Sequence, residues 1–252
     1  MKQLPNLFTL LNLLFGCCAI VTTLELGLTI ATDENGMQWV ILPEKIWLAS
    51  LFIGLAAVVD FLDGFVARWL KASSEMGKQL DSLADVVSFG VAPSVIVYFF
   101  LRLSLSRMEG GLDLAWGWKT PAFLLAAAAA WRLARFNLTP NTQPGFQGVP
   151  TPAAGLLIAS FPLIYWNTSY EWVTRLLEQE IFWYAMIVIV SALMVSRLPL
   201  LAFKFSKGKK SVDLPLILLA VSAIAGFWWL QWLAIPLLFV LYILLSLAFK
   251  KK

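Results

Sequence analysis

The stretch that decides the fold is DFLDGFVARWLKASSEMGKQLDSLAD, residues 60–85. It carries four aspartates, Asp60, Asp63, Asp81 and Asp85, at the facing ends of two apolar segments. The first pair is three residues apart and the second pair four apart, so each pair shares one face of a helix with 3.6 residues per turn. Because the loop between the segments is short, we expect antiparallel helices whose four carboxylates converge on one cavity.

The segments around this stretch predict an all-α, multi-pass transmembrane protein. Hydrophobic residues make up 60% of the 252 residues and charged residues 13%, whereas soluble domains carry about 25% charged residues. A helix crosses a bilayer with about 20 apolar residues. We expect eight spans, near residues 7–30, 46–70, 80–101, 121–136, 151–166 and 181–203, and two within 214–249 that turn near 226–231. Residues 1–205 would form a core, and 206–252 would add the last two helices.

The basic residues predict the orientation. With the N-terminus in the cytoplasm, 14 of the 19 lysines and arginines fall on the cytoplasmic side. Such an excess marks the cytoplasmic loops of membrane proteins. We therefore expect both termini, and the aspartate-rich end of the helices, on the cytoplasmic side of the cell (inner) membrane.

The composition excludes several kinds of chemistry. The chain has no histidine, which removes histidine general bases, Ser-His-Asp triads and zinc sites that need imidazole. Its two cysteines, Cys17 and Cys18, are adjacent within an apolar run and are interpreted as packing residues. Two thiols cannot complete a structural zinc site. Any catalysis must use carboxylates, lysine, arginine, tyrosine, hydroxyl groups or a bound metal.

The four aspartates point to divalent cations. A charged residue inside a span costs about 2.5–3.5 kcal/mol, so four cost on the order of 10 kcal/mol without compensation. Within the quoted stretch, Arg68 and Lys78 are the basic residues near enough to offset this. Oxygen-only ligands favour hard cations such as Mg²⁺, Mn²⁺ or Ca²⁺. The alternative is a purely structural set of paired or protonated aspartates.

The spacing D-x2-D-G-x2-A-R-x8-G-x3-D-x3-D resembles the signature of the CDP-alcohol phosphotransferase family. The resemblance implies a six-helix transmembrane core, a homodimer, and two divalent cations, Mg²⁺ or Mn²⁺. It also implies transfer of a phosphoryl-alcohol group from a CDP-alcohol to a hydroxyl, with release of CMP. Asp60, Asp63, Asp81 and Asp85 would hold the metals, with Asp85 also the general base. The implied contacts to nucleotide and diphosphate are Asn6, Thr9, Gly64, Ala67, Arg68 and Gly77.

Four further segments resemble family members that transfer a phosphatidyl group from CDP-diacylglycerol to L-serine. They are PNLFTLLN (5–12), VVSFGVAP (86–93), RLARFN (132–137) and FQGVPTPAA (146–154). The expected partners are CDP-diacylglycerol, L-serine and membrane lipids, with no nucleic acid. Arg132 and Arg135 share a helix face, where either could bind the serine carboxylate, bind lipid phosphate, or only anchor the helix. The candidate residues for serine or lipid phosphate are Ser88, Arg132, Arg135, Asn137 and Thr151.

Two alternative functions remain open on the sequence. Phosphatidylglycerophosphate and phosphatidylinositol-phosphate synthases of the same family use phosphorylated acceptors, which predict a denser basic cluster at the cavity. A cation-coupled transporter predicts acidic residues near the bilayer midplane and broken helices in both halves of the chain. Here the acidic residues lie toward one surface and in one half, which favours the enzyme.

Overall fold

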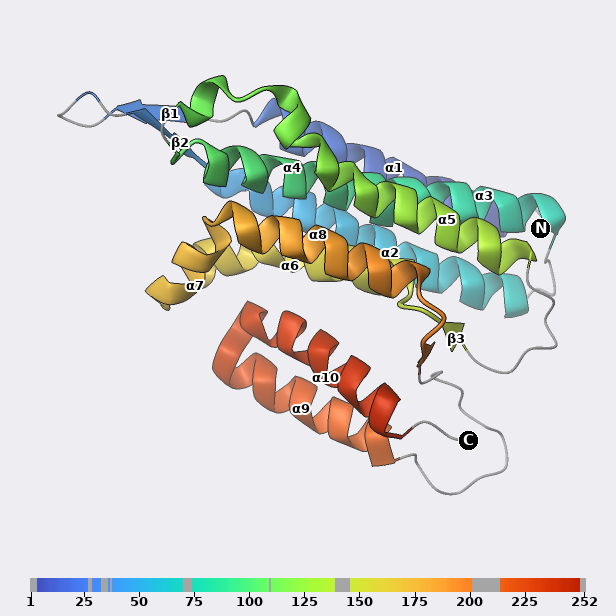
Figure 1. Ribbon diagram of the computed structural model, residues 1–252. Helices are drawn as coiled ribbons and strands as arrows, with labels where there is room; N and C mark the ends of the chain where they lie inside the picture. Colours follow the sequence, from blue (N-terminus) through green and yellow to red (C-terminus); the bar gives the residue numbers. More distant parts are fainter. Residues whose placement is uncertain are drawn as a thin grey trace.

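The computed structural model describes residues 4–26, 29–32, 36, 38–69, 74–108, 110–138, 146–200 and 214–249. Helices dominate and lie side by side as a bundle (Figure 1). This confirms the predicted all-α fold class. The first eight α-helices are α1 (Leu4–Glu25), α2 (Trp47–Trp69), α3 (Glu75–Asp85), α4 (Ala92–Leu105), α5 (Leu124–Leu138), α6 (Thr151–Asn167), α7 (Glu171–Leu177) and α8 (Glu180–Val195).

Short elements connect the helices. Strands β1 (Thr29–Thr32) and β2 (Gln38–Ile41) pair as an antiparallel hairpin, and β3 (Phe146–Gln147) pairs with β4 (Pro199–Leu200), also antiparallel. Before α9, the described residues form the 3₁₀ turns η1 (Glu44–Ile46), η3 (Gly111–Asp113), η4 (Trp116–Trp118) and η5 (Thr120–Phe123). The β1–β2 hairpin projects from the end of the bundle opposite the start of α1 (Figure 1).

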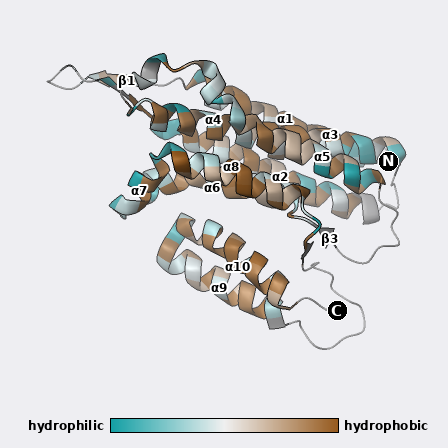
Figure 2. Ribbon diagram, viewed as in Figure 1, coloured by the Kyte–Doolittle hydropathy of each residue, from teal (hydrophilic) through white to brown (hydrophobic). Residues whose placement is uncertain are grey.

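Four helical stretches of the described chain are long and apolar enough to cross a membrane: Pro5–Glu25, Glu44–Val66, Glu75–Leu105 and Ile217–Ala248. The pair α7 and α8, bent by 72°, makes a fifth if it counts as one span. Brown, hydrophobic residues cover most of these helices in Figure 2. A multi-pass membrane protein is thus supported, and the count of eight spans stays a prediction.

Two predicted span boundaries were wrong. The first span was expected to reach Ile30, but α1 ends at Glu25 and Thr29 begins β1. The β-branched pair Ile30 and Val40 faces across the hairpin there, and such residues favour strands. The sixth span was expected to reach residue 203, but α8 ends at Val195. Pro199 follows closely, and a proline disfavours helical backbone at the residue before it.

The stretch Glu75–Leu105 is the central helix of the bundle. In the 18-residue apolar segment of this stretch, 72% is buried, a larger share than in any of the other three stretches. It consists of α3, the π-helix η2 (Val86–Val91) and α4 in direct succession. Its far end packs into an aromatic core in which the Phe100 and Trp183 ring centroids lie 4.4 Å apart. The helix that carries Asp81 and Asp85 is therefore the one most firmly held by its neighbours.

Glycines let two helices approach the π-helix closely. A Cβ atom on Gly155 of α6 would lie 2.9 Å from Cβ and 3.0 Å from Cα of Phe89. A Cβ atom on Gly16 of α1 would lie 2.8 Å from Cα of Ser88. Small residues allow such backbone contacts between membrane helices. Helices α1 and α6 thus both pack closely against the segment directly after Asp85.

The last two helices form a hairpin. Helices α9 (Leu214–Leu230) and α10 (Ala234–Ala248) lie side by side and are joined by the 3₁₀ turn η6 (Gln231–Leu233) (Figure 1). This turn is close to the position expected from the sequence. Helix α10 packs against α6 and β4. It ends on the side of the bundle where α1 begins (Figure 1).

The close contact at Gly155 makes a first prediction. We expect Gly155→Ala to destabilise the protein by about 1–3 kcal/mol, because the added methyl group overpacks against Phe89. The matched control is Gly54→Ala on α2, where an added Cβ meets nothing within 4 Å. This control should keep or raise the melting temperature, since alanine favours a helix by about 1 kcal/mol over glycine. Thermal unfolding in detergent measures both, and equal melting temperatures for the two variants would contradict the packing.

Candidate active site

Three of the four aspartates form a compact cluster. Asp60 and Asp63 project from α2 and Asp81 from α3, and one carboxylate oxygen from each lies within 4.8 Å of the others. Asp85, one turn after Asp81, is 6% exposed, and its carboxyl group interacts electrostatically with that of Asp60. The predicted convergence is confirmed for Asp60, Asp63 and Asp81.

Helix α1 supports this cluster, which the sequence did not predict. It packs along both α2 and α3, more extensively than those two helices pack against each other. The Thr9 hydroxyl donates a hydrogen bond of 2.9 Å to Oδ2 of Asp63. The Asn12 side-chain amide donates one of 3.2 Å to Oδ1 of Asp85. Thr9 and Asn12 are three residues apart on one face of α1, a spacing that could have signalled a polar stripe facing the aspartates.

The described part of the chain provides no ion pair for the cluster. Its two salt bridges, Arg107–Glu178 and Arg175–Glu171, involve other residues. Lys78 donates instead to the backbone oxygen of Asn137, at 3.2 Å. One oxygen of Asp81, Oδ1, is buried without a hydrogen-bond partner among the described residues. Clustered carboxylate oxygens with an unused buried acceptor fit a hard divalent cation such as Mg²⁺ or Mn²⁺.

The residues expected to border the nucleotide lie beside the cluster. A Cβ atom on Gly64 would meet nothing within 4 Å, so open space adjoins this part of α2. Gly77 lies close to Asn6, whose Oδ1 would be 3.0 Å from such an atom. The structure thus brings Asn6 and Gly77 together and leaves room at Gly64. Ala67 and Arg68 belong to α2, but their side chains lie outside the described residues, so their roles stay predictions.

Arg132 and Thr151 contact each other between α5 and α6. Arg132 of α5 is 6% exposed and donates a hydrogen bond of 3.0 Å to the Thr151 hydroxyl at the start of α6. Its guanidinium interacts electrostatically with Asp85. Its Nε is buried without a hydrogen-bond partner among the described residues. A charged group with an unused donor near Asp85 is suited to bind an anionic part of a substrate.

The other acceptor candidates have protein partners. Arg135 donates to the backbone oxygens of Val195 and Ser196, at 2.8 and 3.2 Å, and so ties α5 to the end of α8. Asn137 donates to the Ser82 hydroxyl at 2.8 Å, which ties α5 to α3. The Ser88 hydroxyl donates to the backbone oxygen of Asn12 at 3.0 Å. The geometry therefore favours Arg132 over Arg135 as a substrate contact.

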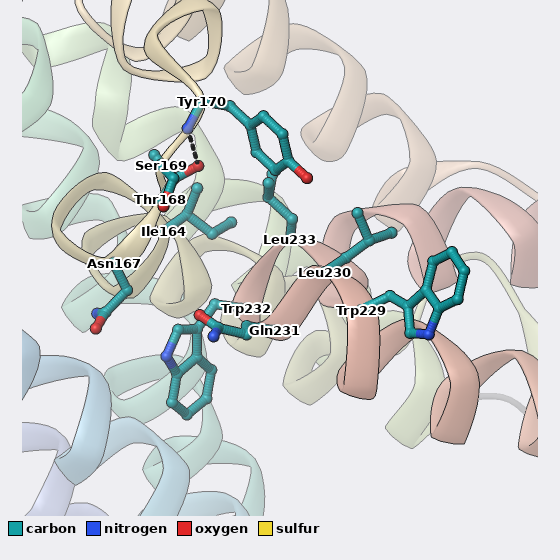
Figure 3. Close-up of a pocket in the computed structure, with 10 residues that line it drawn as sticks. All are labelled: Ile164, Asn167, Thr168, Ser169, Tyr170, Trp229, Leu230, Gln231, Trp232 and Leu233. Carbon is teal, nitrogen blue, oxygen red and sulfur yellow. Dashed lines mark hydrogen bonds between the residues drawn. The ribbon is translucent and has the colours of Figure 1, made fainter.

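The C-terminal hairpin also reaches this region. Tyr242 of α10 is 8% exposed and interacts electrostatically with Arg132, a neighbour that the sequence did not predict. A separate cavity of about 130 Å³ lies at the other end of α6, against the α9–α10 turn (Figure 3). Its lining contains none of the predicted site residues. It is therefore distinct from the aspartate cluster.

Comparison with known proteins identifies the family of the chain. The family described as CDP-alcohol phosphatidyltransferase matches residues 2–196, which include α1 to α8 and the whole aspartate cluster. The chain belongs to the CDP-alcohol phosphatidyltransferase family. The expected family resemblance is thereby confirmed. The α9–α10 hairpin lies outside the matched residues.

Several relatives of this chain have the name CDP-diacylglycerol–serine O-phosphatidyltransferase. The Helicobacter pylori protein is 31% identical over 202 residues, which cover 79% of this chain and 72% of that protein. The Bacillus subtilis protein is 32% identical over 165 residues, covering 66% of this chain and 78% of its own length. The Methanocaldococcus jannaschii protein is 40% identical over 109 residues, covering 43% and 47%.

The unused oxygen of Asp81 makes a second prediction. We expect Mn²⁺ or Mg²⁺ to raise the melting temperature of the protein, because a bound cation stabilises the folded state. Asp81→Asn should weaken the apparent affinity at least about tenfold, a loss of roughly 1.4 kcal/mol. Glu75→Gln, on an exposed side chain of the same helix, is the control and should titrate as the parent does. An unchanged titration of Asp81→Asn would show that the cluster does not hold the cation.

Proposed function

We propose that this protein transfers the phosphatidyl group of CDP-diacylglycerol to the hydroxyl of L-serine, giving phosphatidylserine and CMP. The observation that carries the proposal is the convergence of Asp60, Asp63 and Asp81 within 4.8 Å, with Asp85 beside them. The names of the relatives support the choice of serine. No second acceptor is favoured by the described side chains, since Arg135 is engaged with α8.

The reaction requires a base and an open path to phosphorus. In our proposal, the serine hydroxyl oxygen attacks the phosphorus that bears diacylglycerol. Asp85 accepts the proton of that hydroxyl. The new bond joins serine oxygen to this phosphorus, and the bond to the bridging oxygen breaks, so that CMP departs with that oxygen. General-base catalysis of this kind contributes about 10²–10⁴-fold. Asp85 is suited to the role because it lies beside Asp60, Asp63 and Asp81 but is not one of these three clustered carboxylates.

The remaining aspartates would hold the metal. Asp60, Asp63 and Asp81 are the proposed ligands of two divalent cations, Mg²⁺ or Mn²⁺, with Asp85 also within reach. Bound cations would supply positive charge that polarises the diphosphate. Asn6, Thr9, Gly64, Ala67, Arg68 and Gly77 are the proposed border of the nucleotide and diphosphate.

Arg132 is the proposed contact for the serine carboxylate. A charge-assisted hydrogen bond to a carboxylate is among the strong ones, and the guanidinium offers several donors. Thr151 holds one of these donors at 3.0 Å, which fixes the direction of the side chain. The Arg132 Nε has no hydrogen-bond partner among the described residues, which leaves a donor for the substrate.

We also propose that the site opens to the cytoplasmic side of the cell (inner) membrane. Fourteen of the 19 basic residues fall on that side in the predicted topology, as the positive-inside rule requires. The homodimer and the division into a core of residues 1–205 and a hairpin of 206–252 stay predictions. The mass of the protein–detergent complex checks the first of them.

The proposed activity is tested by CMP release from purified protein in detergent with CDP-diacylglycerol and Mg²⁺ or Mn²⁺. L-Serine, glycerol 3-phosphate and inositol phosphate are supplied in turn as acceptors. We expect release with serine, and a loss of about 10²-fold or more in Asp85→Asn. Release with a phosphorylated acceptor and not with serine would assign the protein to another reaction of the family.

The different partners of the two arginines make a further prediction. Arg132→Ala should raise the KM for serine about 10- to 150-fold, because it removes a contact of roughly 1.5–3 kcal/mol. The KM for CDP-diacylglycerol should change little. Arg135→Ala is the matched control and should lower the melting temperature while the KM for serine stays near that of the parent. If the parent KM for serine persists in Arg132→Ala, the serine carboxylate binds elsewhere.

A further inference from the structure

Two side chains of α1 reach different members of the aspartate cluster. Thr9 contacts Asp63, and Asn12 contacts Asp85. We infer that Asn12 is a positioning residue that holds Asp85 in the orientation needed to accept a proton, whereas Thr9 supports Asp63 as a cation ligand. The inference rests on the proposed function and assigns separate tasks to the two contacts.

Helix α1 is fixed at Asn12 by contacts with the segment that follows Asp85. Asn12 is fully buried, with 0% exposure. Its backbone oxygen accepts a hydrogen bond of 3.0 Å from the Ser88 hydroxyl, three residues after Asp85. Gly16, one turn further along α1, allows this approach, since a Cβ atom there would lie 2.8 Å from Cα of Ser88. The backbone of α1 is thus fixed against the segment that carries Asp85.

The chemistry of the amide suits a positioning role. The Asn12 amide nitrogen donates to Oδ1 of Asp85 at 3.2 Å, and an amide of this kind stays neutral. In this inference one carboxylate oxygen, Oδ1, is held by the amide, and the proton of a substrate hydroxyl goes to the other oxygen, Oδ2. The amide oxygen of Asn12 is buried without a hydrogen-bond partner among the described residues. It offers an acceptor beside the same reaction site.

Thr9 acts on a different carboxylate. Thr9 is 4% exposed, and its hydroxyl lies 2.9 Å from Oδ2 of Asp63 and 3.2 Å from the backbone oxygen of Pro5. Asp63 belongs to the compact group with Asp60 and Asp81. Loss of the Thr9 hydroxyl should therefore alter the hold on a cation. It should leave the orientation of Asp85 unchanged.

The test separates cation binding from turnover. Cation binding is read from the Mn²⁺-dependent rise in melting temperature, which needs no turnover. Turnover is read as CMP release at saturating Mn²⁺, with whichever acceptor the parent protein uses. The variants are Asn12→Ala, Asn12→Leu, which preserves side-chain volume, and Thr9→Val, with Thr9→Ser as the conservative variant. Cys17→Ala, at an exposed free thiol on α1, is the control.

We expect both Asn12 variants to lower kcat about 10- to 100-fold, as loss of one buried hydrogen bond to a charged group implies. Their Mn²⁺ titration should match that of the parent. Thr9→Val should shift the Mn²⁺ midpoint upward by about 3- to 10-fold, and Thr9→Ser should restore the midpoint.

Two results would overturn the inference. In the first, the Asn12 variants bind Mn²⁺ and turn over as the parent does. In the second, they shift the Mn²⁺ midpoint and recover full kcat at saturation, so that Asn12 only supports the cation. Failure of the proposed function appears separately, as absence of serine-dependent CMP release in the parent protein. If Asn12→Ala does not fold, the volume-preserving Asn12→Leu decides.

Discussion

Carboxylates clustered in an apolar helix bundle are the constraint on which this structure depends. Each charged group within a span costs about 2.5–3.5 kcal/mol, and four aspartates gather at one place here. Among the described residues the compensation is partial. Helix α1 donates hydrogen bonds to Asp63 and Asp85, and Arg132 interacts electrostatically with Asp85. The buried oxygen of Asp81 has no hydrogen-bond partner in the part of the chain that the structure describes, which leaves a place for a cation.

The arrangement of helices follows from holding these groups in place. Asp81 and Asp85 belong to the most buried of the four long apolar stretches. A π-helix begins at Val86, directly after Asp85, and such segments are frequent at functional sites. Gly16 and Gly155 bring α1 and α6 against this segment. The side chains at the cluster are therefore oriented by backbone contacts that tolerate little movement.

The sequence predicted the cluster because its signal is local. Residues three or four apart on a helix share a face, and two such pairs joined by a short loop must face each other. The same reasoning failed for the support of the cluster. The contact of Asn12 with Asp85 joins residues 73 positions apart, and periodicity carries no information on such pairs. The end of α1 was placed too late because an apolar run continues past Glu25, where strand pairing replaces the helix.

The sequence was equally unable to distinguish the roles of Arg132 and Arg135. Their spacing places both side chains on one face of α5, and it does not indicate that they have different partners. Packing separates them, because α6 offers a hydroxyl to Arg132 while α8 offers its terminal carbonyl groups to Arg135. The hairpin of α9 and α10 adds Tyr242 near Arg132, from a part of the chain outside the family match.

The central claim is that divalent cations compensate the charge of the clustered aspartates. Its most direct test is an anomalous difference map from crystals of the protein grown with Mn²⁺. The account predicts strong peaks at coordination distance, about 2 Å, from carboxylate oxygens of Asp60, Asp63 and Asp81. A map without a peak at these residues, in a structure where lysine or arginine side chains neutralise the cluster, would contradict it.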